Sequence, residues 1–568
     1  MSAAAPPSAA ALPWLTALTD PATYPHAVGA IELIHTHLSV VALTGEFAYK
    51  FKKPVNYGFA DFSTLERRWE FCRAEVALNR RFAPELYLGV VRLVRTAAGW
   101  RLRPVDADAT ETELGRGETR VDAREPKVDA SEPRVGDGAE PAVRMRQFAA
   151  GDCLDVMLAE GRLSPALIDD LAAVVAAMHH DLPPVSAAQA QDSPRRLAAA
   201  LAENFACLPA TAALRDMRRR CDDRLASLQP LLAARAAGGA VRDCHGDLHL
   251  QNLCLWRGRP TAFDCIEFNP ALRRIDVLAD AAFLFMDLCV RGRRDLALRW
   301  LDGYLAATGD YTGLPAWPLW VAYRAMVRAK IAHLTLSAPG VPADRQTELA
   351  ARRENCLALA DETLREHPVA LAVMVGLPGS GKSTRAMELV QTLPGGGLRL
   401  RSDVERARMF PAVALAGAAG VPPNDVPSPS SGRGAAAARS DAGSDLAPAK
   451  EKYSAAATEK VYARLRELAG AVLAGGFSAI LDATHLTRAQ RAAAIARGWA
   501  ASVPVRLVHC TGSDAELRAR LAARGASRTT RPDGAIGAAE PSEADAAVLA
   551  LLAPRFEPFT AEELRLLG

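Results

Sequence analysis

The segment from Gly376 to Ser383 has the spacing Gly-x-x-x-x-Gly-Lys-Ser of a phosphate-binding loop. In such a loop the backbone N–H groups wrap phosphates, the lysine reaches the outer phosphates and the hydroxyl group reaches Mg²⁺. An apolar run at 369–375 precedes the loop and a helical pattern at 384–390 follows it, so phosphate would meet a helix N-terminus. We therefore predict a site for ATP and Mg²⁺. Its predicted ATP-binding residues are Gly376, Gly379, Ser380, Gly381, Lys382, Ser383 and Thr384, and Ser383 is also a predicted metal ligand.

Two aspartates follow short apolar runs downstream of this loop. Asp403 comes after the run near Leu398–Leu400, and Asp482 ends the run that begins at Phe477. Ligands gather at the carboxyl ends of strands in α/β sheets, so both carboxylates should face the phosphate loop. Asp482 is predicted to support the metal, and Asp403 to accept the proton of a substrate hydroxyl. A helix N-cap is the alternative role for Asp403.

A second nucleotide signature lies upstream, at His245-Gly-Asp-Leu-His-Leu-Gln-Asn252. Its spacing follows the logic of a kinase catalytic loop, in which an aspartate accepts the hydroxyl proton and an asparagine five residues later holds Mg²⁺. Asp247 and Asn252 are predicted to take these roles. Asp264, delivered by the apolar run at 260–263, is predicted to be the second metal ligand.

A lysine on an earlier strand is predicted to complete this second ATP site. Lys50 has the spacing of the strand lysine that pairs with ATP phosphates, and Glu75 on the next helical segment is its predicted ion-pair partner. Lys52 lies on the same face of the strand and is the reserve candidate. Glu70 is the alternative to Glu75. The segment 34–38 stands where a glycine-rich loop would be expected and contains no glycine.

The helices and strands that position these residues are predicted to belong to more than one domain. At 568 residues the chain is too long for a single core, and about two to four domains are expected. We predict an α+β domain over 1–366, with a strand hairpin in 31–54 and mainly helical chain after 163. An α/β P-loop domain with a parallel sheet is predicted over 367–568. Two biased segments, 106–140 and 411–450, are predicted to be disordered insertions.

Composition and charge argue against several classes of protein. The formal net charge is only +3, which argues against a protein that coats nucleic acid. The ten cysteines form no Cys-x-x-Cys pair, which argues against structural zinc and against a secreted disulfide framework. The sequence predicts no signal peptide and no membrane span, so the cytoplasm is the expected compartment. Oligomeric state and substrates stay open.

The second half resembles the small P-loop kinases, a group with gluconate kinase-like, zeta-toxin-like and polynucleotide 5′-kinase-like proteins. Arg401-Ser-Asp-Val, Tyr453-Ser-x-x-x-Thr458 and Leu481-Asp-Ala-Thr484 carry this resemblance. It implies a lid whose arginines clamp phosphates. The arginines that it suggests are Arg488, Arg491, Arg520 and Arg524.

The first half resembles aminoglycoside phosphotransferases and choline kinases, through the His-Gly-Asp-x-His form of its loop. Nearly the whole chain resembles bacterial two-domain proteins that join such a protein-kinase-like domain to a P-loop, AAA-family ATPase domain. The residues that carry this wider resemblance include Leu43-Thr-Gly-x-x-Ala-Tyr-Lys50, Asp61-Phe-Ser-Thr-Leu-Glu-Arg67 and Phe263-Asp-Cys-Ile-Glu-Phe-Asn269.

Together these patterns predict a bifunctional, Mg²⁺-dependent phosphotransferase, a kinase that uses ATP and a small hydroxylated molecule as phosphate acceptor. One alternative is a regulatory protein that binds or hydrolyses ATP and uses one or both sites as a switch. Another is a kinase of nucleic-acid ends in the second domain, and a basic groove beside Asp403 would support this alternative. The small net charge argues against nucleic acid as a partner.

Overall fold

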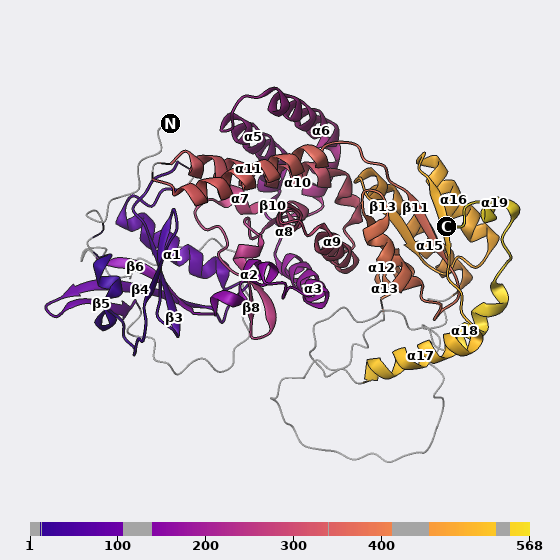
Figure 1. The fold of residues 1–568 in the computed structure, drawn as a ribbon, viewed down its shortest axis with the longest axis horizontal. Helices are drawn as coiled ribbons and strands as arrows, with labels where there is room; N and C mark the ends of the chain where they lie inside the picture. The colour runs from indigo at the N-terminus through magenta and orange to yellow at the C-terminus, as the bar shows by residue number, and fades with distance from the viewer. Residues whose placement is uncertain are drawn as a thin grey trace, which may run out of the picture. The chain divides into compact units, whose positions relative to one another are not determined.

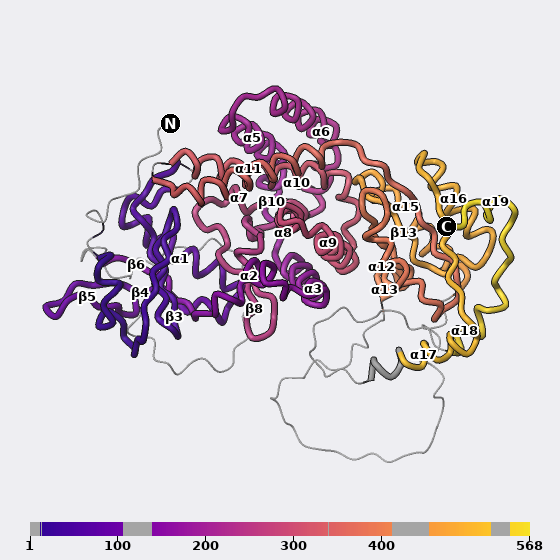
Figure 2. Tube along the Cα trace, in the orientation of Figure 1, coloured from indigo at the N-terminus to yellow at the C-terminus, as the bar shows by residue number. Residues whose placement is uncertain are grey.

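The computed structural model describes residues 12, 14–58, 60–105, 139–338, 340–411, 454–529 and 546–568. The predicted insertions at 106–140 and 411–450 lie almost entirely outside these described residues. The chain forms two compact units (Figures 1 and 2). Unit 1 comprises Met1–Ala297 and Ala316–Arg365, and unit 2 comprises Leu298–Pro315 and Glu366–Gly568. The segment 298–315, which the predicted boundary assigns to the first domain, therefore belongs to the second unit.

Unit 1 begins with a six-stranded antiparallel sheet in the order β1-β2-β3-β6-β4-β5. Its strands are β1 (Glu32–His35), β2 (Ser39–Leu43), β3 (Phe47–Lys52), β4 (Tyr87–Thr96), β5 (Gly99–Pro104) and β6 (Glu140–Arg146). Successive side chains of a strand point to opposite faces. In β3, Tyr49 and Phe51 enter the apolar core of one face, so Lys50 and Lys52 lie on the other face, toward helix α1 (Leu65–Asn79).

Helices form most of the rest of unit 1, together with two short strand pairs. The helices are α2 (Leu154–Ala159), α3 (Pro165–Asp181), α4 (Ala187–Gln191), α5 (Ser193–Ala206), α6 (Ala212–Ala237), α7 (Pro270–Arg273), α8 (Val277–Val290), α10 (Trp317–Leu336) and α11 (Ala343–Thr363). The strand pairs are β7 (Val241–Asp243) with β10 (Arg274–Asp276), and β8 (Leu253–Trp256) with β9 (Arg259–Ala262). Helix α8 is buried along most of its length, and it anchors the loop that joins β7 to β8.

Unit 2 contains a four-stranded parallel sheet in the order β12-β13-β11-β14. Its strands are β11 (Leu371–Val375), β12 (Gly397–Arg401), β13 (Ser478–Asp482) and β14 (Val505–His509). The helices are α12 (Lys382–Thr392), α13 (Ser402–Met409), α15 (Ala455–Ala474), α16 (Arg488–Ala500), α17 (Asp514–Thr529), α18 (Ala546–Leu552) and α19 (Ala561–Leu564). All five residues of β11 are buried, as expected for a central strand of a parallel sheet.

A buried ion pair explains why the segment 298–315 belongs to unit 2. Helix α9 (Arg294–Thr308) carries Asp302, whose carboxylate accepts hydrogen bonds from the backbone and the guanidinium group of Arg399 in β12, at 2.7–2.9 Å. The Tyr311 hydroxyl donates to the carbonyl of Arg399 at 3.2 Å. Both charged side chains are almost fully buried, so this contact is part of the unit's interior.

The predicted fold class is confirmed. An antiparallel sheet with one packed helix and a following helical region is the protein-kinase-like arrangement, and the second unit is an α/β fold around a parallel sheet. Across the described ranges, no helix is both long and apolar enough to cross a bilayer.

Candidate functional site

The phosphate loop of unit 2 connects β11 to α12 and approaches neighbouring backbone too closely for larger residues. Gly376 has φ +149°, and a Cβ atom there would lie 2.3 Å from the carbonyl oxygen of Cys510. Gly379 has φ +81°, and its Cβ would lie 2.8 Å from the carbonyl oxygen of Leu517. These glycines are thus required by the path of the loop.

The polar atoms of this loop fit a bound phosphate. The hydroxyl oxygen of Ser380 is buried and has no hydrogen-bond partner among the described residues. The ammonium group of Lys382 donates to the carbonyl of Leu377, 2.7 Å away, at the first turn of α12. A buried hydroxyl without a partner is costly, and a phosphate at this helix N-terminus would supply one. The loop therefore implies nucleotide binding.

The two predicted acids lie at the carboxyl ends of neighbouring strands. Asp482 ends β13, pairs in register with Arg401 of β12, and is 6 % exposed. Burial and the charge of Asp403 raise the pKa of Asp482, although Arg401 and Lys382 oppose the shift. A cation beside Asp482 and Asp403 would relieve this repulsion, so the pair fits a divalent metal. Asp403 lies in the first turn of α13, whose N-cap position is occupied by Arg401.

Two of the four suggested clamp arginines contact the C-terminal segment. Arg491 is fully buried; its guanidinium group pairs with Glu563 at 2.7 Å and donates to the carbonyl of Leu486 at 2.9 Å. The interpretation of Arg491 as a phosphate clamp is therefore wrong. The guanidinium group of Arg488 donates to the carbonyl of Pro558 at 3.0 Å, which also ties it to the C-terminal segment rather than to the loop.

Arg520 is the suggested arginine that lies beside the phosphate loop. Its guanidinium group, carried by α17, donates to the carbonyl of Gly379 at 3.3 Å. The side chain of Arg524 lies outside what the structure describes. Arg520 is thus the candidate for a phosphate contact in unit 2.

In unit 1, Lys50 and Lys52 share a cluster of carboxylates. The Lys50 ammonium lies 2.8 Å from Glu75 and 2.5 Å from Asp264. The Lys52 ammonium lies 2.7 Å from the other oxygen of Glu75 and also pairs with Glu267. Lys52, Glu75 and Glu267 are buried, whereas Asp264 is 42 % exposed. The sequence-based alternative Glu70 is exposed on α1, so Glu75 is the partner of Lys50.

Burial and charge act in opposite directions on the two buried carboxylates of this cluster. Burial favours protonation of Glu75, but Lys50 and Lys52 outweigh it and lower the pKa of Glu75 from 4.5 to about 2. Burial raises the pKa of Glu267, and Glu75 adds to the rise while Lys52 opposes it. Glu75 is therefore the carboxylate that stays ionised most firmly between the two lysines.

The predicted catalytic loop brings Asp247 and Asn252 together. The Asn252 amide donates to the Asp247 carboxylate at 3.0 Å, and the His249 ring lies 3.3 Å from the same oxygen. Burial would raise the pKa of Asp247, but His249, Arg328 and His245 outweigh it and lower that pKa below its ordinary value. Asp247 is therefore ionised at neutral pH and held in position by Asn252 and His249.

Asp264 is held in a left-handed backbone conformation at the end of β9. Its φ is +61°, and its backbone N–H donates to the Tyr87 hydroxyl at 3.0 Å. The His245 ring donates to the carbonyl of Phe263 at 2.9 Å and thereby links the catalytic loop to Asp264. A non-glycine residue with positive φ is uncommon, so surrounding contacts determine where this carboxylate points.

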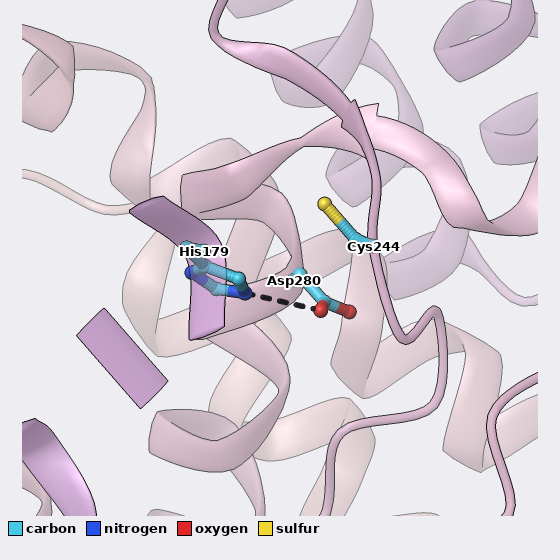
Figure 3. A group of neighbouring side chains, drawn as sticks. All are labelled: His179, Cys244 and Asp280. Atoms are coloured by element: carbon cyan, nitrogen blue, oxygen red, sulfur yellow. Dashed lines mark hydrogen bonds and ion pairs between the residues drawn. The ribbon is translucent and has the colours of Figure 1, made fainter. Parts of the chain in front are cut away.

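The catalytic loop rests on Asp280 of α8. The two oxygens of this carboxylate accept the backbone N–H groups of His245 at 3.1 Å and Gly246 at 2.9 Å. Figure 3 shows the His179 ring facing the same carboxylate, 3.3 Å away, with Cys244 beside them. These three residue types can hold a metal. Here, however, the Asp280 oxygens already accept backbone donors, and burial raises the pKa of the Cys244 thiol, so the group acts as a support.

The hairpin between β1 and β2 occupies the place of a glycine-rich loop. The backbone N–H of Thr36 donates to the carbonyl of Ser39, and the N–H of Ser39 donates to the Thr36 hydroxyl, both at 2.9 Å. The ammonium group of Lys53 pairs with the carbonyl of Thr36. These two backbone donors are satisfied within the turn and are not directed at a phosphate.

Several residues of unit 1 escaped the sequence analysis. Tyr87, His249 and Arg328 contact or flank the predicted residues, and Glu267 pairs with Lys52 although the sequence predicts no role for it. The second histidine of His-Gly-Asp-Leu-His was a usable signal for His249. Tyr87 and Arg328 have no such local signal, because each reaches the site from a distant segment.

Comparison with known proteins supports the two-part organisation. A family model described as an AAA domain matches residues 371–559. The uncharacterized proteins Rv2004c of Mycobacterium tuberculosis and Mb2027c of Mycobacterium bovis are each 31 % identical over 398 residues, which cover 69 % of this chain and 71 % of theirs.

Solved structures resemble the kinase-like part at low scores. An amicoumacin kinase, hAmiN, is 15 % identical with a TM-score of 0.33, covering 58 % of this chain and 88 % of its own. A choline/ethanolamine kinase family protein from Mesorhizobium loti is 13 % identical with a TM-score of 0.31, covering 59 % and 93 %.

Proposed function

The chain belongs to the same family as the mycobacterial protein Rv2004c, and from that premise we propose that it is a bifunctional phosphotransferase using Mg²⁺ and ATP. Its acceptors are small hydroxylated molecules. The observation that carries the proposal is the convergence in unit 1 of Asp247, Asn252, Asp264 and Lys50. Asp247 is hydrogen-bonded to Asn252, Lys50 is paired with Asp264, and His245 connects the two pairs.

In the proposed reaction of unit 1, the acceptor hydroxyl oxygen forms a bond to the terminal phosphorus and the bond from phosphorus to the ADP oxygen breaks. Asp247 takes the hydroxyl proton, and ADP leaves with the bonding electrons. A positioned base contributes about 10²- to 10⁴-fold. Bound Mg·ATP supplies the phosphoryl group and charge neutralisation. Asn252 and Asp264 would hold the metal, and Lys50 would turn from Asp264 to the phosphates while Glu75 keeps it oriented.

In unit 2, the proposed ATP-binding residues are those of the phosphate loop, with Lys382 on the outer phosphates. Ser383 and Asp482 would hold the metal. Asp403 would accept the acceptor's proton, and Arg520 would contact phosphate from α17. The shared strand-end position of Asp482 and Asp403, and the effect of Asp403 on the pKa of Asp482, support this assignment.

The test is Mg²⁺-dependent ADP formation by the full chain, with and without a pooled extract of small metabolites. Wild type, Asp247→Asn and Lys382→Ala are compared, and the double variant gives the background. Stimulation that falls in both single variants and disappears in the double variant supports transfer in both units, whereas stimulation lost entirely in one single variant assigns the activity to that unit alone. If the extract stimulates none of the proteins while ATP still binds, the phosphotransferase proposal fails.

A regulatory protein that binds ATP is the second candidate, and the turn of the β1–β2 hairpin favours it for unit 1. The N–H groups of Thr36 and Ser39 are satisfied within that turn, so this hairpin offers fewer phosphate contacts than a glycine-rich loop. ATP binding to unit 1 without turnover, unchanged by Asp247→Asn, would support this alternative.

A further inference from the structure

A group of three arginines lies beside the catalytic loop of unit 1. Arg291 at the end of α8, Arg328 on α10 and Arg352 on α11 all act on the pKa of one buried carboxylate, Asp287. Arg291 is 3.1 Å and Arg352 3.8 Å from that carboxylate, and Arg291 also lies 3.9 Å from Asp155. Among the described residues, the carboxylates of Asp287 and Asp155 are thus paired within this group, while Arg328 also acts on the catalytic carboxylate of Asp247.

Arg328 is the member of this group whose guanidinium group contacts no carboxylate of the described residues, although it acts on Asp287 and Asp247 through its charge. Among the residues that the structure describes, its guanidinium group forms no ion pair with a carboxylate, and its buried Nε has no hydrogen-bond partner. One Nη atom lies 3.4 Å from the Gln251 side-chain oxygen, and the other lies 3.2 Å from Nε2 of His249. A buried cationic donor without an acceptor is costly.

The protonation of His249 makes the contact with Arg328 a poor one. The backbone N–H of Gln251 donates to Nδ1 of His249 at 3.2 Å, so in the neutral ring the proton lies on Nε2. That proton is directed at Asp247, 3.3 Å away. Nε2 is then a donor and cannot accept from Arg328. The guanidinium group of Arg328 therefore has N–H donors without an acceptor close to the carboxylate of Asp247.

We propose that the acceptor phosphorylated by unit 1 carries an anionic group, a carboxylate or a phosphate ester, that binds Arg328 while its hydroxyl lies on Asp247. Nε2 of His249 lies 3.2 Å from the Arg328 guanidinium group and 3.3 Å from the Asp247 carboxylate. One small molecule can therefore contact both Arg328 and Asp247. Planar, bidentate N–H donors suit both kinds of oxyanion. Arg352 is the second cation of the same group. This inference rests on the proposed function of unit 1.

The competing role for Arg328 is contact with the phosphoryl group in transfer. That role acts on the transition state and lowers kcat, whereas binding of an acceptor anion acts mainly on KM for the acceptor. The two roles are therefore separable by kinetics.

The experiment uses the full chain carrying Lys382→Ala, so that only unit 1 is active. A metabolite extract is divided by ion exchange at neutral pH into anionic, neutral and cationic fractions, and each is tested for stimulation of ADP formation. The anionic fraction is expected to stimulate. Stimulation by the neutral or the cationic fraction alone overturns the inference and leaves the proposed function intact. No stimulation by the whole extract overturns the proposed function of unit 1, and this inference with it.

Two further arms identify the anion and the residue. Treating the anionic fraction with alkaline phosphatase, later removed, abolishes stimulation if the group is a phosphate ester and preserves it if it is a carboxylate. Arg328→Gln should raise KM for the active fraction by about 10- to 100-fold with KM for ATP unchanged, and Arg328→Lys should recover part of the loss. Arg353→Gln, which removes a cation paired with exposed Glu354 on α11, is the matched control. A fall in kcat with unchanged acceptor KM in Arg328→Gln would overturn the assignment.

Discussion

Replacing Glu75 with glutamine tests the buried charge cluster of unit 1. The pKa of Glu75 is lowered from 4.5 to about 2, which by linkage corresponds to about 3 kcal/mol of stabilisation at neutral pH. Lys50 keeps Asp264 and Lys52 keeps Glu267 in the variant, and Glu267 ionises more easily once Glu75 is gone. We therefore expect Glu75→Gln to lower the free energy of unfolding of unit 1 by about 2–3 kcal/mol.

Hydrogen exchange of the amides in β3 and α1, read by mass spectrometry, reports the opening of unit 1 in the intact chain. A loss of this size predicts exchange that is about 30- to 150-fold faster than in the wild type. Glu70→Gln, on the exposed face of α1, is the control and should change the free energy by no more than about 0.5 kcal/mol.

The same variant has a defined pH dependence. A carboxylate whose pKa is depressed in the folded state stabilises above its unfolded pKa and loses that contribution as the pH falls toward its folded pKa. The contribution of Glu75 should thus be complete above pH 5 or so, fall to about half near pH 3, and vanish below about 2. Equal exchange rates in Glu75→Gln and the control Glu70→Gln would refute the account of this cluster. A difference in exchange between Glu75→Gln and the wild type that does not shrink at pH 3 would also refute it.

Three further outcomes follow from unit 2. Lys382→Ala should reduce the number of ATP molecules bound per chain from two to one, measured by calorimetric titration. Arg491→Gln should destabilise unit 2 by about 3 kcal/mol, because it leaves Glu563 buried without its partner, while KM for ATP stays unchanged; a rise in KM alone would restore the clamp interpretation. Asp302→Asn should speed exchange in β12 by about 100-fold or more, since it breaks the buried pair with Arg399; an unchanged β12 would contradict the role of this segment.

The sequence predicted those parts of the site whose chemistry fixes a short spacing. The phosphate loop requires glycines, a lysine and a hydroxyl within eight positions, and the path of Gly376 past Cys510 shows the steric reason. Asp247 and Asn252 lie five positions apart and share a hydrogen bond. A residue pattern can encode such geometry because the backbone between the residues is short.

The remaining contacts join distant segments, and no local pattern encodes them. The resemblance to small P-loop kinases suggests Arg491 as a phosphate clamp, yet its guanidinium group pairs with Glu563, 72 positions later. The segment around Asp302 has the pattern of an ordinary helix, and only the fold places it against Arg399. In a chain so rich in arginine, residue type alone does not distinguish a structural guanidinium group from one that binds phosphate.

The charges of unit 1 are arranged differently on the two sides of Asp247. On the side of Lys50, two ammonium groups face three carboxylates, so this cluster has a net charge of one negative unit and suits a divalent cation that accompanies phosphates. On the side of Arg328, three guanidinium groups face Asp287 and Asp155, with Asp247 itself between the two sides. Transfer between two anions is opposed by their mutual repulsion. In the proposed reaction, a metal would compensate the charge of the nucleotide and arginine that of the acceptor, so that both could approach Asp247 without competing for the same cation.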